Sequence, residues 1–248
     1  MEIYEEKWKV NLSECDMFGC WRPSAIMTAM QETASRHSEV LGVGLTEMTE
    51  RGIAWVLSRG SVQMEKMPKT GEHILIRTYP LTAKHLFWPR VHIFFSNDGE
   101  EIGRAYCLWV VMDTRTRRIV KSPYVEEHMP KNKHMKSGMG LPVTVHPLEN
   151  ESTETWVHPQ FTEVDCLGHV NNTKYLDWCY NAIGYDVLKD LFIAGFDINY
   201  DAETLLSDKL LTRLCIEEDR FSFVGWDEDK QHFAISGFLK PRSMQGES

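Results

Sequence analysis

An internal repeat constrains this 248-residue chain most, because a motif that occurs twice predicts two copies of one structural unit. Residues 13–21 read SECDMFGCW, and residues 162–170, which lie 149 positions later, read TEVDCLGHV. A hydroxyl residue, an acid, an aspartate and a glycine recur in step. Cys20 in the first copy stands where His169 stands in the second. One half is therefore expected to be a scaffold, and the other to carry a titratable imidazole.

The first half is predicted to contain a strand, a long helix and four further strands. A strand-like run covers residues 4–12, and Pro23 suits the first turn of a helix whose apolar stripe runs from Ile26 to Leu41. The four later strands are expected at residues 53–65, 73–84, 87–96 and 102–112. Asn97-Asp98-Gly99 predicts a hairpin between the last two of them.

The second half repeats this order. A strand is expected near residues 155–160, and Asn172 can cap a helix whose apolar stripe runs from Tyr175 to Ile183. Four strand-like runs follow at residues 196–202, 210–217, 220–225 and 232–239. Each half should therefore form an antiparallel sheet that buries its apolar face against one long helix.

This order predicts an α+β fold of two tandem hotdog units, each an antiparallel sheet wrapped around a long helix. The expected boundaries are residues 1–113 for the N-terminal unit, 114–150 for a basic linker and 151–248 for the C-terminal unit. Residues 114–136 include seven basic and two acidic residues, so this stretch has a net charge of +5 and the rest of the chain −14. The overall charge of −9 argues against a general nucleic-acid binder.

Several other classes of protein are disfavoured. The N-terminus has no apolar signal core, no run approaches a membrane span, and the six cysteines contain no CxxC pair. These features indicate a cytoplasmic protein with reduced thiols. A metal site is not expected, because the histidines and cysteines lack ligand spacing, and the dinucleotide, P-loop and GxSxG motifs are missing from the sequence.

The residues around the second helix start could support acyl transfer. Asp165 lies four positions before His169 and could fix the tautomer of its ring. The unpaired N–H groups at the start of the helix could stabilise an oxyanion, and Asn171 could add its side-chain amide. The alternative is that these residues are only turn formers and helix caps.

Two further groups have the same ambiguity. Glu203 falls on the polar side at the end of the strand over 196–202, where it is either a catalytic carboxylate or a solvated strand terminus. Cys166 and Cys179 could be nucleophiles, but Cys179 lies on the apolar stripe and is expected in the core.

Residues 165–178, DCLGHVNNTKYLDW, resemble the signature of the acyl-acyl carrier protein thioesterase family, and Tyr200 to Thr204 resemble its second motif. The resemblance covers nearly the whole chain and implies catalytic roles for Asp165, His169 and Glu203. It also implies that the N-terminal half supplies much of the acyl pocket. Plant relatives carry an asparagine at the position of Leu167 and a cysteine at that of Thr204. Either Asn171 orients the substrate here or that role is absent, and a Cys–His nucleophile cannot operate at those positions.

The resemblance implies hydrolysis of acyl-acyl carrier protein, with release of a free fatty acid. No cofactor is expected, because a thioester is already activated. Two alternatives stay open, namely an acyl-coenzyme A thioesterase and a non-catalytic acyl-binding hotdog protein. The expected partner is an acyl carrier protein, and the expected oligomeric state is a monomer or a homodimer. The sequence does not indicate which length of acyl chain is preferred.

Overall fold

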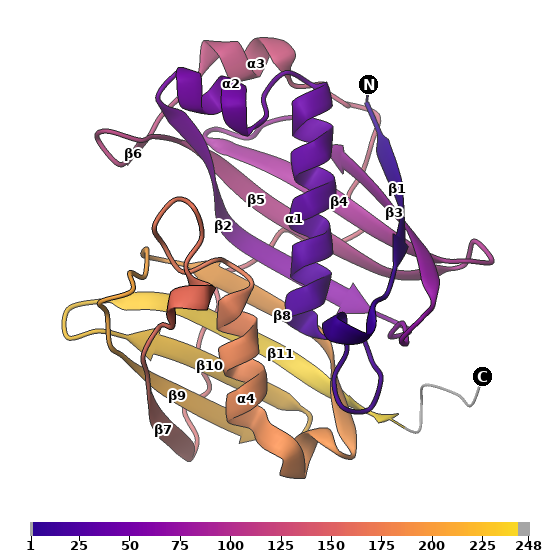
Figure 1. Ribbon diagram of the computed structural model, residues 1–248, viewed down its shortest axis with the longest axis vertical. Coiled ribbons are helices and arrows are strands. Elements are labelled where there is room, and N and C mark those ends of the chain that lie inside the picture. Colours follow the sequence, from indigo (N-terminus) through magenta and orange to yellow (C-terminus); the bar gives the residue numbers. More distant parts are fainter. Residues whose placement is uncertain (1, 243–248) are drawn as a thin grey trace.

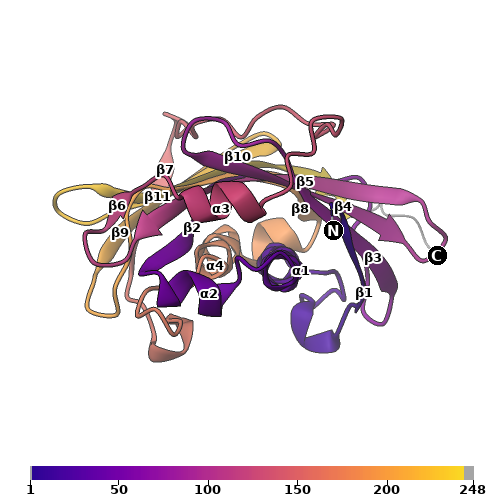
Figure 2. The ribbon, with the colours of Figure 1, turned by 90° about the horizontal axis from the view of Figure 1, so that it is seen from above.

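The computed structural model describes residues 2–242, in which two long helices lie side by side on one face of a broad antiparallel sheet (Figures 1 and 2). The N-terminal half contains β1 (Tyr4–Lys9), α1 (Pro23–Val40), α2 (Leu45–Glu50), β2 (Ile53–Met64), β3 (His73–Pro80), β4 (Phe87–Ser96) and β5 (Glu101–Asp113). The C-terminal half contains β7 (Ser152–Val157), α4 (Lys174–Leu188), β8 (Leu191–Tyr200), β9 (Leu210–Glu217), β10 (Arg220–Trp226) and β11 (Gln231–Pro241).

The sheet joins the two halves through its central strands. Its order is β1-β3-β4-β5-β2-β8-β11-β10-β9-β7, so each half contributes five adjacent strands in equivalent order. β2 pairs with β8 in antiparallel register, with Gly60 opposite Ile198. The predicted α+β class and the two tandem hotdog units are confirmed by this arrangement.

The long helices bury the stripes expected from the sequence. Met27 and Ala29 of α1 are fully buried, as are Leu176 and Cys179 of α4, and all four belong to one core that extends through both halves. Cys179 is therefore a core residue, as expected. Burying this apolar surface is the main force that holds each helix against the sheet.

Residues 131–148 of the segment between the halves cover the face of the sheet opposite the long helices (Figure 2), whereas residues 123–129 pack beside α2. Tyr79 donates its hydroxyl to the backbone oxygen of Lys136 at 2.9 Å, and the N–H of Val145 donates to the Asn199 side chain at 3.4 Å. The segment also contains β6 (Arg118–Ile119) and α3 (Pro123–His128), which the sequence analysis did not predict. Ser122 caps α3 and Pro123 occupies its first turn, two local signals that its short length obscured.

Other differences are confined to element ends. β8 begins at Leu191 rather than near residue 196, because α4 ends at Leu188 and the chain turns at once into the sheet. The cap residue of α4 is Thr173, not Asn172. Within residues 2–242, no helix combines the length and the apolar character needed to cross a membrane.

Candidate active site

The loop before α4 is a tight turn built by Asp165 and Gly168. The N–H of Asp165 donates to the backbone oxygen of His169 at 2.9 Å, and that of Gly168 donates to the backbone oxygen of Asp165 at 3.0 Å. The Asp165 carboxylate accepts from the N–H of Leu167 at 2.9 Å. Gly168 has φ 84°, a left-handed conformation that favours glycine. The Asp and Gly of the motif are thus explained by backbone geometry.

His169, Glu203 and Arg117 meet at the mouth of this loop. The Nε2 atom of His169 lies 3.2 Å from Oε2 of Glu203. The Nη2 atom of Arg117 lies 2.7 Å from the same ring nitrogen and also forms an ion pair with Glu203. A guanidinium group can only donate, so Nε2 of His169 accepts and its ring proton is placed on Nδ1.

Arg117 is held by the turn between β5 and β6. Asp113 accepts from the N–H of Thr116 at 2.7 Å, and the N–H of Arg117 donates to the backbone oxygen of Asp113 at 2.9 Å. Arg117 itself has φ 58°, which is uncommon for a residue with a side chain. The N-terminal half therefore contributes a cation to catalytic candidates of the C-terminal half. In the sequence, Arg117 is distinguished only as one member of the basic segment.

The expected contact between Asp165 and the imidazole is not formed. The Asp165 carboxylate contacts the Leu167 N–H, and among the described residues the carboxylate beside the His169 ring belongs to Glu203. An acid in an Asp-x-x-Gly turn satisfies its own backbone first. Asp165 thus shapes the loop that carries His169, and its separation of four residues does not bring it to the ring.

Most of the helix-start N–H groups are also occupied. The N–H of Val170 donates to the backbone oxygen of Thr204 at 2.8 Å, and that of Asn171 donates to Glu163 at 2.8 Å. The Asn171 side chain accepts from both the N–H and the hydroxyl of Thr173, at 3.0 and 2.8 Å. The Asn171 side chain therefore closes the turn that leads into α4. In this stretch of the described chain, the N–H of Asn172 is left as an available donor.

A cavity of about 640 Å³ contains the candidate groups. His169, Glu203 and Arg117 line it together with Asn172, Tyr175 and Tyr200. The Tyr200 hydroxyl donates to the backbone oxygen of Asn172 at 2.7 Å. Burial raises the pKa of Tyr175 to about 12 and also raises that of Tyr200. Both phenols are therefore neutral near pH 7 and cannot serve as general bases there.

A hydrogen-bonded relay of Asp227, His232 and Thr204, which the sequence did not predict, supports the Glu203 loop. The Oδ2 atom of Asp227 lies 2.7 Å from Nε2 of His232, and Nδ1 of the same ring lies 2.9 Å from the hydroxyl oxygen of Thr204. The hydrogen bond with His232, joined by the N–H groups of Asp229 and Lys230, lowers the pKa of Asp227. The ionised carboxylate holds the Nε2 proton of His232, so Nδ1 accepts from Thr204.

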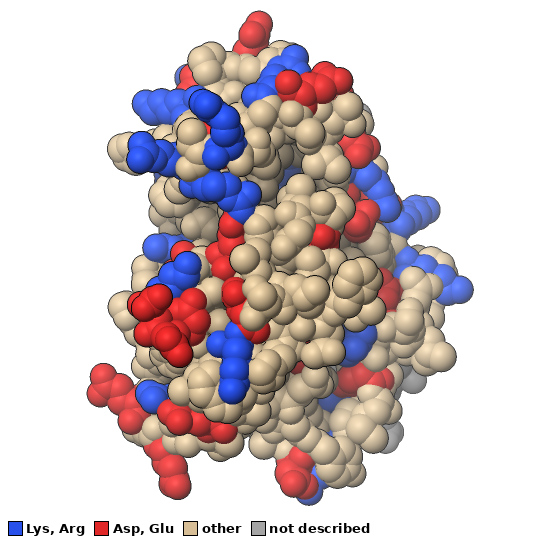
Figure 3. All heavy atoms as spheres, turned by 60° about the vertical axis from the view of Figure 1, so that its left-hand side comes forward, with Lys and Arg blue, Asp and Glu red and all other residues tan. Residues whose placement is uncertain are grey.

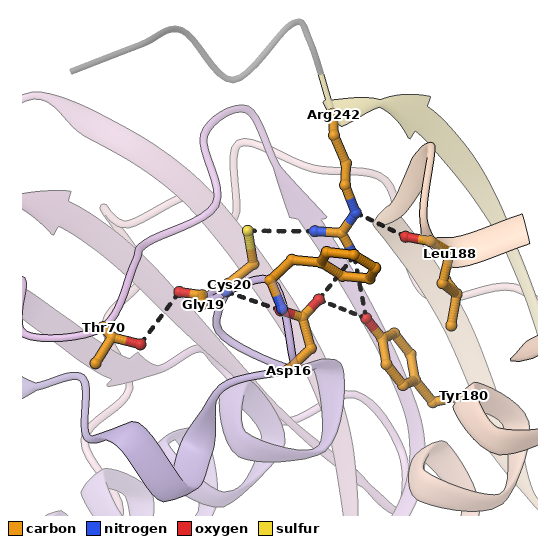
Figure 4. Close-up of polar contacts among 8 residues, drawn as sticks. Asp16, Gly19, Cys20, Thr70, Tyr180, Leu188 and Arg242 are labelled. Carbon is orange, nitrogen blue, oxygen red and sulfur yellow. Dashed lines mark hydrogen bonds and ion pairs between the residues drawn. The ribbon is translucent and has the colours of Figure 1, made fainter. Parts of the chain in front are cut away.

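The N-terminal copy of the loop has the same backbone turn but a different function (Figure 4). Asp16 accepts from the N–H of Phe18 at 2.9 Å, as Asp165 does from Leu167. The oxygen Oδ2 of Asp16 also accepts from the Tyr180 hydroxyl at 2.8 Å and from Nη2 of Arg242 at 2.7 Å. Figure 4 shows that these side chains come from both halves and close around Asp16.

This copy is a structural junction. Burial raises the pKa of the Cys20 thiol, so the position equivalent to His169 holds a neutral group. Burial opposes ionisation of Asp16, but the hydrogen bonds from Cys20, Tyr180 and Arg242 outweigh it and lower the pKa of that carboxyl. A buried Asp–Arg pair across the two halves replaces the His–Glu pair of the second copy.

The basic segment divides into two groups. On the side where Figure 1 shows β6, Lys and Arg gather in one region, with Asp and Glu below them (Figure 3). Arg115, Arg117, Arg118 and Lys121 surround β6 beside Glu203. Lys131, Lys133 and Lys136 follow α3, and the chain there bonds to β3, where Asn132 donates to Pro80 at 2.8 Å. β4 lies between β3 and β5 in the sheet, so the two groups are anchored at different strands.

The chain has relatives among known proteins that match most of its length. The family profile for the acyl-ACP thioesterase N-terminal domain matches residues 1–127, and that for the C-terminal domain matches residues 147–233. A chloroplastic dodecanoyl-[acyl-carrier-protein] hydrolase from Cinnamomum camphora is 28% identical over 209 residues, covering 75% of this chain and 52% of the relative. A palmitoyl-acyl carrier protein thioesterase from Cuphea hookeriana is 26% identical over 192 residues, covering 72% and 46%.

Solved structures agree with the fold. An acyl-ACP thioesterase from Bacteroides thetaiotaomicron superposes with a TM-score of 0.86 at 19% identity, covering 96% of this chain and 98% of that one. The 12:0-ACP thioesterase from Umbellularia californica gives 0.83 at 20% identity, covering 97% and 98%. The chain spans about half the length of the curated relatives it matches.

Proposed function

The chain belongs to the acyl-ACP thioesterase family, and we propose that it hydrolyses the thioester of acyl-acyl carrier protein to release a free fatty acid. The observation that carries this proposal is the meeting of His169 and Glu203 at 3.2 Å inside a cavity of about 640 Å³. A carboxylate and an imidazole this close together can both contact and activate one water molecule beside them.

The proposed chemistry uses the C-terminal half as the catalytic unit. Glu203 accepts a proton from water, the oxygen attacks the thioester carbonyl, and the carbon–sulfur bond breaks. The proton then returns to the leaving thiolate through Glu203 or His169. Thr204, which donates its hydroxyl to His232, is already engaged, so a nucleophilic role for that hydroxyl is not part of this scheme.

Charge that develops on the carbonyl oxygen requires donors. The free N–H of Asn172 lies at the cavity wall, and Arg117 supplies a fixed positive charge beside Glu203. Asp165 contributes indirectly, because its turn places His169, and Asn171 contributes by closing the turn that leads into α4. The site therefore draws Arg117 from one half and the remaining groups from the other, and needs no second chain.

The acyl chain is proposed to lie in the N-terminal half. A second cavity of about 290 Å³ lies between α1, α2 and the sheet. It shares Ala54, Trp55 and Leu167 with the catalytic cavity, so the two cavities adjoin. Leu167 stands where plant relatives carry a polar amide and here lines both cavities. This arrangement supports the division of labour implied by the family resemblance.

Substitution of the two catalytic candidates tests the proposal. His169→Ala and Glu203→Gln should each lower hydrolysis of acyl carrier protein substrates by about 10²–10⁴-fold, the usual effect of removing a general acid–base group. Cys20→Ala at the equivalent position of the other half is the matched control and should stay within a few-fold of the wild type. Normal turnover by folded His169→Ala protein would remove this residue from the mechanism.

The nature of the carrier is tested with matched substrates. Acyl carrier protein and coenzyme A thioesters of the same chain length are compared, and released fatty acids are measured by mass spectrometry. The proposal expects a higher kcat/KM for the carrier protein. A preference for coenzyme A would reassign the substrate, and retention of acyl ligand without release of acid would indicate a binding protein.

A further inference from the structure

The acyl cavity of the N-terminal half contains a buried cation that lacks an acidic partner. Arg90 on β4 lines this cavity and is only 4% exposed. Its Nη1 atom donates to Nδ1 of His37 at 3.0 Å and to the Thr78 hydroxyl at 3.3 Å. None of the ion pairs found among residues 2–242 includes Arg90.

This guanidinium retains both its charge and spare donors. Burial lowers the pKa of Arg90 to about 10, which leaves the group protonated near pH 7. Its hydrogen bonds to described residues both start from Nη1, whereas a guanidinium has five N–H donors. A buried charge is costly unless it is paired or fully hydrogen-bonded, so a wall of this kind is poorly matched to a purely apolar ligand.

A second donor lines the same cavity. Trp109 on β5 is a lining residue, and its indole N–H is buried with no acceptor among the described residues. Trp55, another lining residue, shows the contrasting case, because its indole N–H donates to the backbone oxygen of Val43 at 3.0 Å. Buried donors are normally satisfied, and an exception calls for an explanation.

We propose that the cavity selects acyl chains that carry a neutral hydrogen-bond-accepting oxygen, a hydroxyl or a keto group, which Arg90 and Trp109 recognise. A neutral oxygen is favoured over a carboxylate because Glu32 lines the same cavity and would repel a second negative charge. This inference rests on the proposed function, since it assumes that the acyl chain of the thioester enters this cavity.

A position series of substrates tests the inference directly. Acyl carrier protein is loaded with an unsubstituted chain and with chains of the same length that carry one hydroxyl near the thioester, in the middle or near the far end. The wild type should prefer at least one hydroxylated chain by about tenfold or more in kcat/KM, the effect of one charge-assisted hydrogen bond. A ratio of one or less at every position would overturn the inference.

Variants assign the preference to the two donors. Trp109→Phe and Arg90→Met should each bring the ratio of hydroxylated to unsubstituted kcat/KM toward one. Trp55→Phe is the matched control, because it removes an indole N–H that Val43 already accepts, and it should keep the ratio. If Arg90→Met does not fold, Trp109→Phe and Arg90→Lys decide the question.

Two different outcomes distinguish failure of this inference from failure of the proposed function. An unchanged ratio in folded Trp109→Phe and Arg90→Met proteins, with normal hydrolysis, would overturn the inference and leave the proposed function intact. Failure of the wild type to release acid from any substrate in the series would overturn the proposed function itself.

Discussion

Substitution of Arg117 distinguishes most clearly between a role in docking the carrier protein and a role in catalysis. Its guanidinium contacts His169 Nε2 at 2.7 Å and forms an ion pair with Glu203, so Arg117→Ala removes two charge-assisted contacts from the catalytic pair. Such contacts contribute about 1.5–3 kcal/mol each when shielded from water. The Arg117 and Glu203 side chains are 42% and 41% exposed, which weakens the pair through solvent screening.

The combined loss should be about 1–2 kcal/mol of transition-state stabilisation, or roughly a 5- to 30-fold fall in kcat. The assay is steady-state hydrolysis of an acyl carrier protein substrate and of a small uncharged thioester. Because Arg117 acts on the catalytic groups, kcat should fall for both substrates. Guanidinium ion added to the solution should restore part of the activity of Arg117→Ala, and Arg117→Lys should lie between that variant and the wild type.

Arg118→Ala is the matched control, since the neighbouring arginine lies on β6 and has no ion pair with Glu203 among the contacts of residues 2–242. This control should leave hydrolysis of the small thioester unchanged. The reasoning is refuted if Arg117→Ala raises only the KM for the carrier substrate and leaves kcat intact. Arg117 would then be a docking residue, as the charge pattern of the sequence alone suggests.

Three further outcomes follow from other parts of the structure. Arg242→Ala should lower the free energy of unfolding by about 3 kcal/mol, because it leaves Asp16, whose side chain is 5% exposed, without its ion pair. The kcat of this variant should stay within about twofold of the wild type. Urea unfolding measures the first quantity and steady-state turnover the second. The pKa of Asp227 is lower in the folded protein than its ordinary value of 3.8. The ionised carboxylate therefore stabilises the fold fully above that ordinary value, and this stabilisation is lost as the pH falls through the pKa of the folded state. Asp227→Asn should therefore flatten the acid side of the melting-temperature profile, and an unaltered profile would show that the relay does not couple to folding. For docking, Arg118→Glu with Lys121→Glu should raise KM for the carrier protein at low salt more than Lys131→Glu with Lys133→Glu, and the difference should shrink as salt is added.

The sequence was sufficient for the fold because periodic patterns and turn signals agree along most of the chain. The predicted strands over 87–96 and 210–217 coincide with β4 and β9, and α1 starts at Pro23 as expected. The missed elements are short. Six residues are too few for α3 to show a helical period, and β6 has only two. Their positions depend on packing against the sheet.

The candidate site was only partly predictable, because sequence distance and spatial distance diverge there. His169 and Glu203, both candidates from the sequence, lie 3.2 Å apart. Asp165 was expected at the ring because it is close in sequence, but its carboxylate satisfies the turn. Arg117 lies 86 residues before Glu203, and only the antiparallel pairing of β2 with β8 brings their loops together.

The two halves show why one chain has one candidate site. Trp21 and Val170 make equivalent backbone bonds, to Pro68 and Thr204 respectively, so Met67 stands at the position of Glu203. Both groups that are proposed to be catalytic are thus replaced in the N-terminal copy.

The arginines that contact the two loops also differ. Arg242 follows β11 as Arg117 follows the equivalent strand β5, and each crosses to the loop of the other half. Arg242 is only 15% exposed, donates to the backbone oxygen of Leu188 at 2.7 Å and lies 4.2 Å from the centre of the Phe18 ring. Such a cation is fixed by its surroundings, whereas Arg117 stays exposed and contacts the groups proposed to react. If the copies differed only by His against Cys, the N-terminal copy would still have a carboxylate and an accessible cation at these positions. Instead, the imidazole, the carboxylate and the accessible guanidinium all lack a counterpart there, and a buried junction occupies the site.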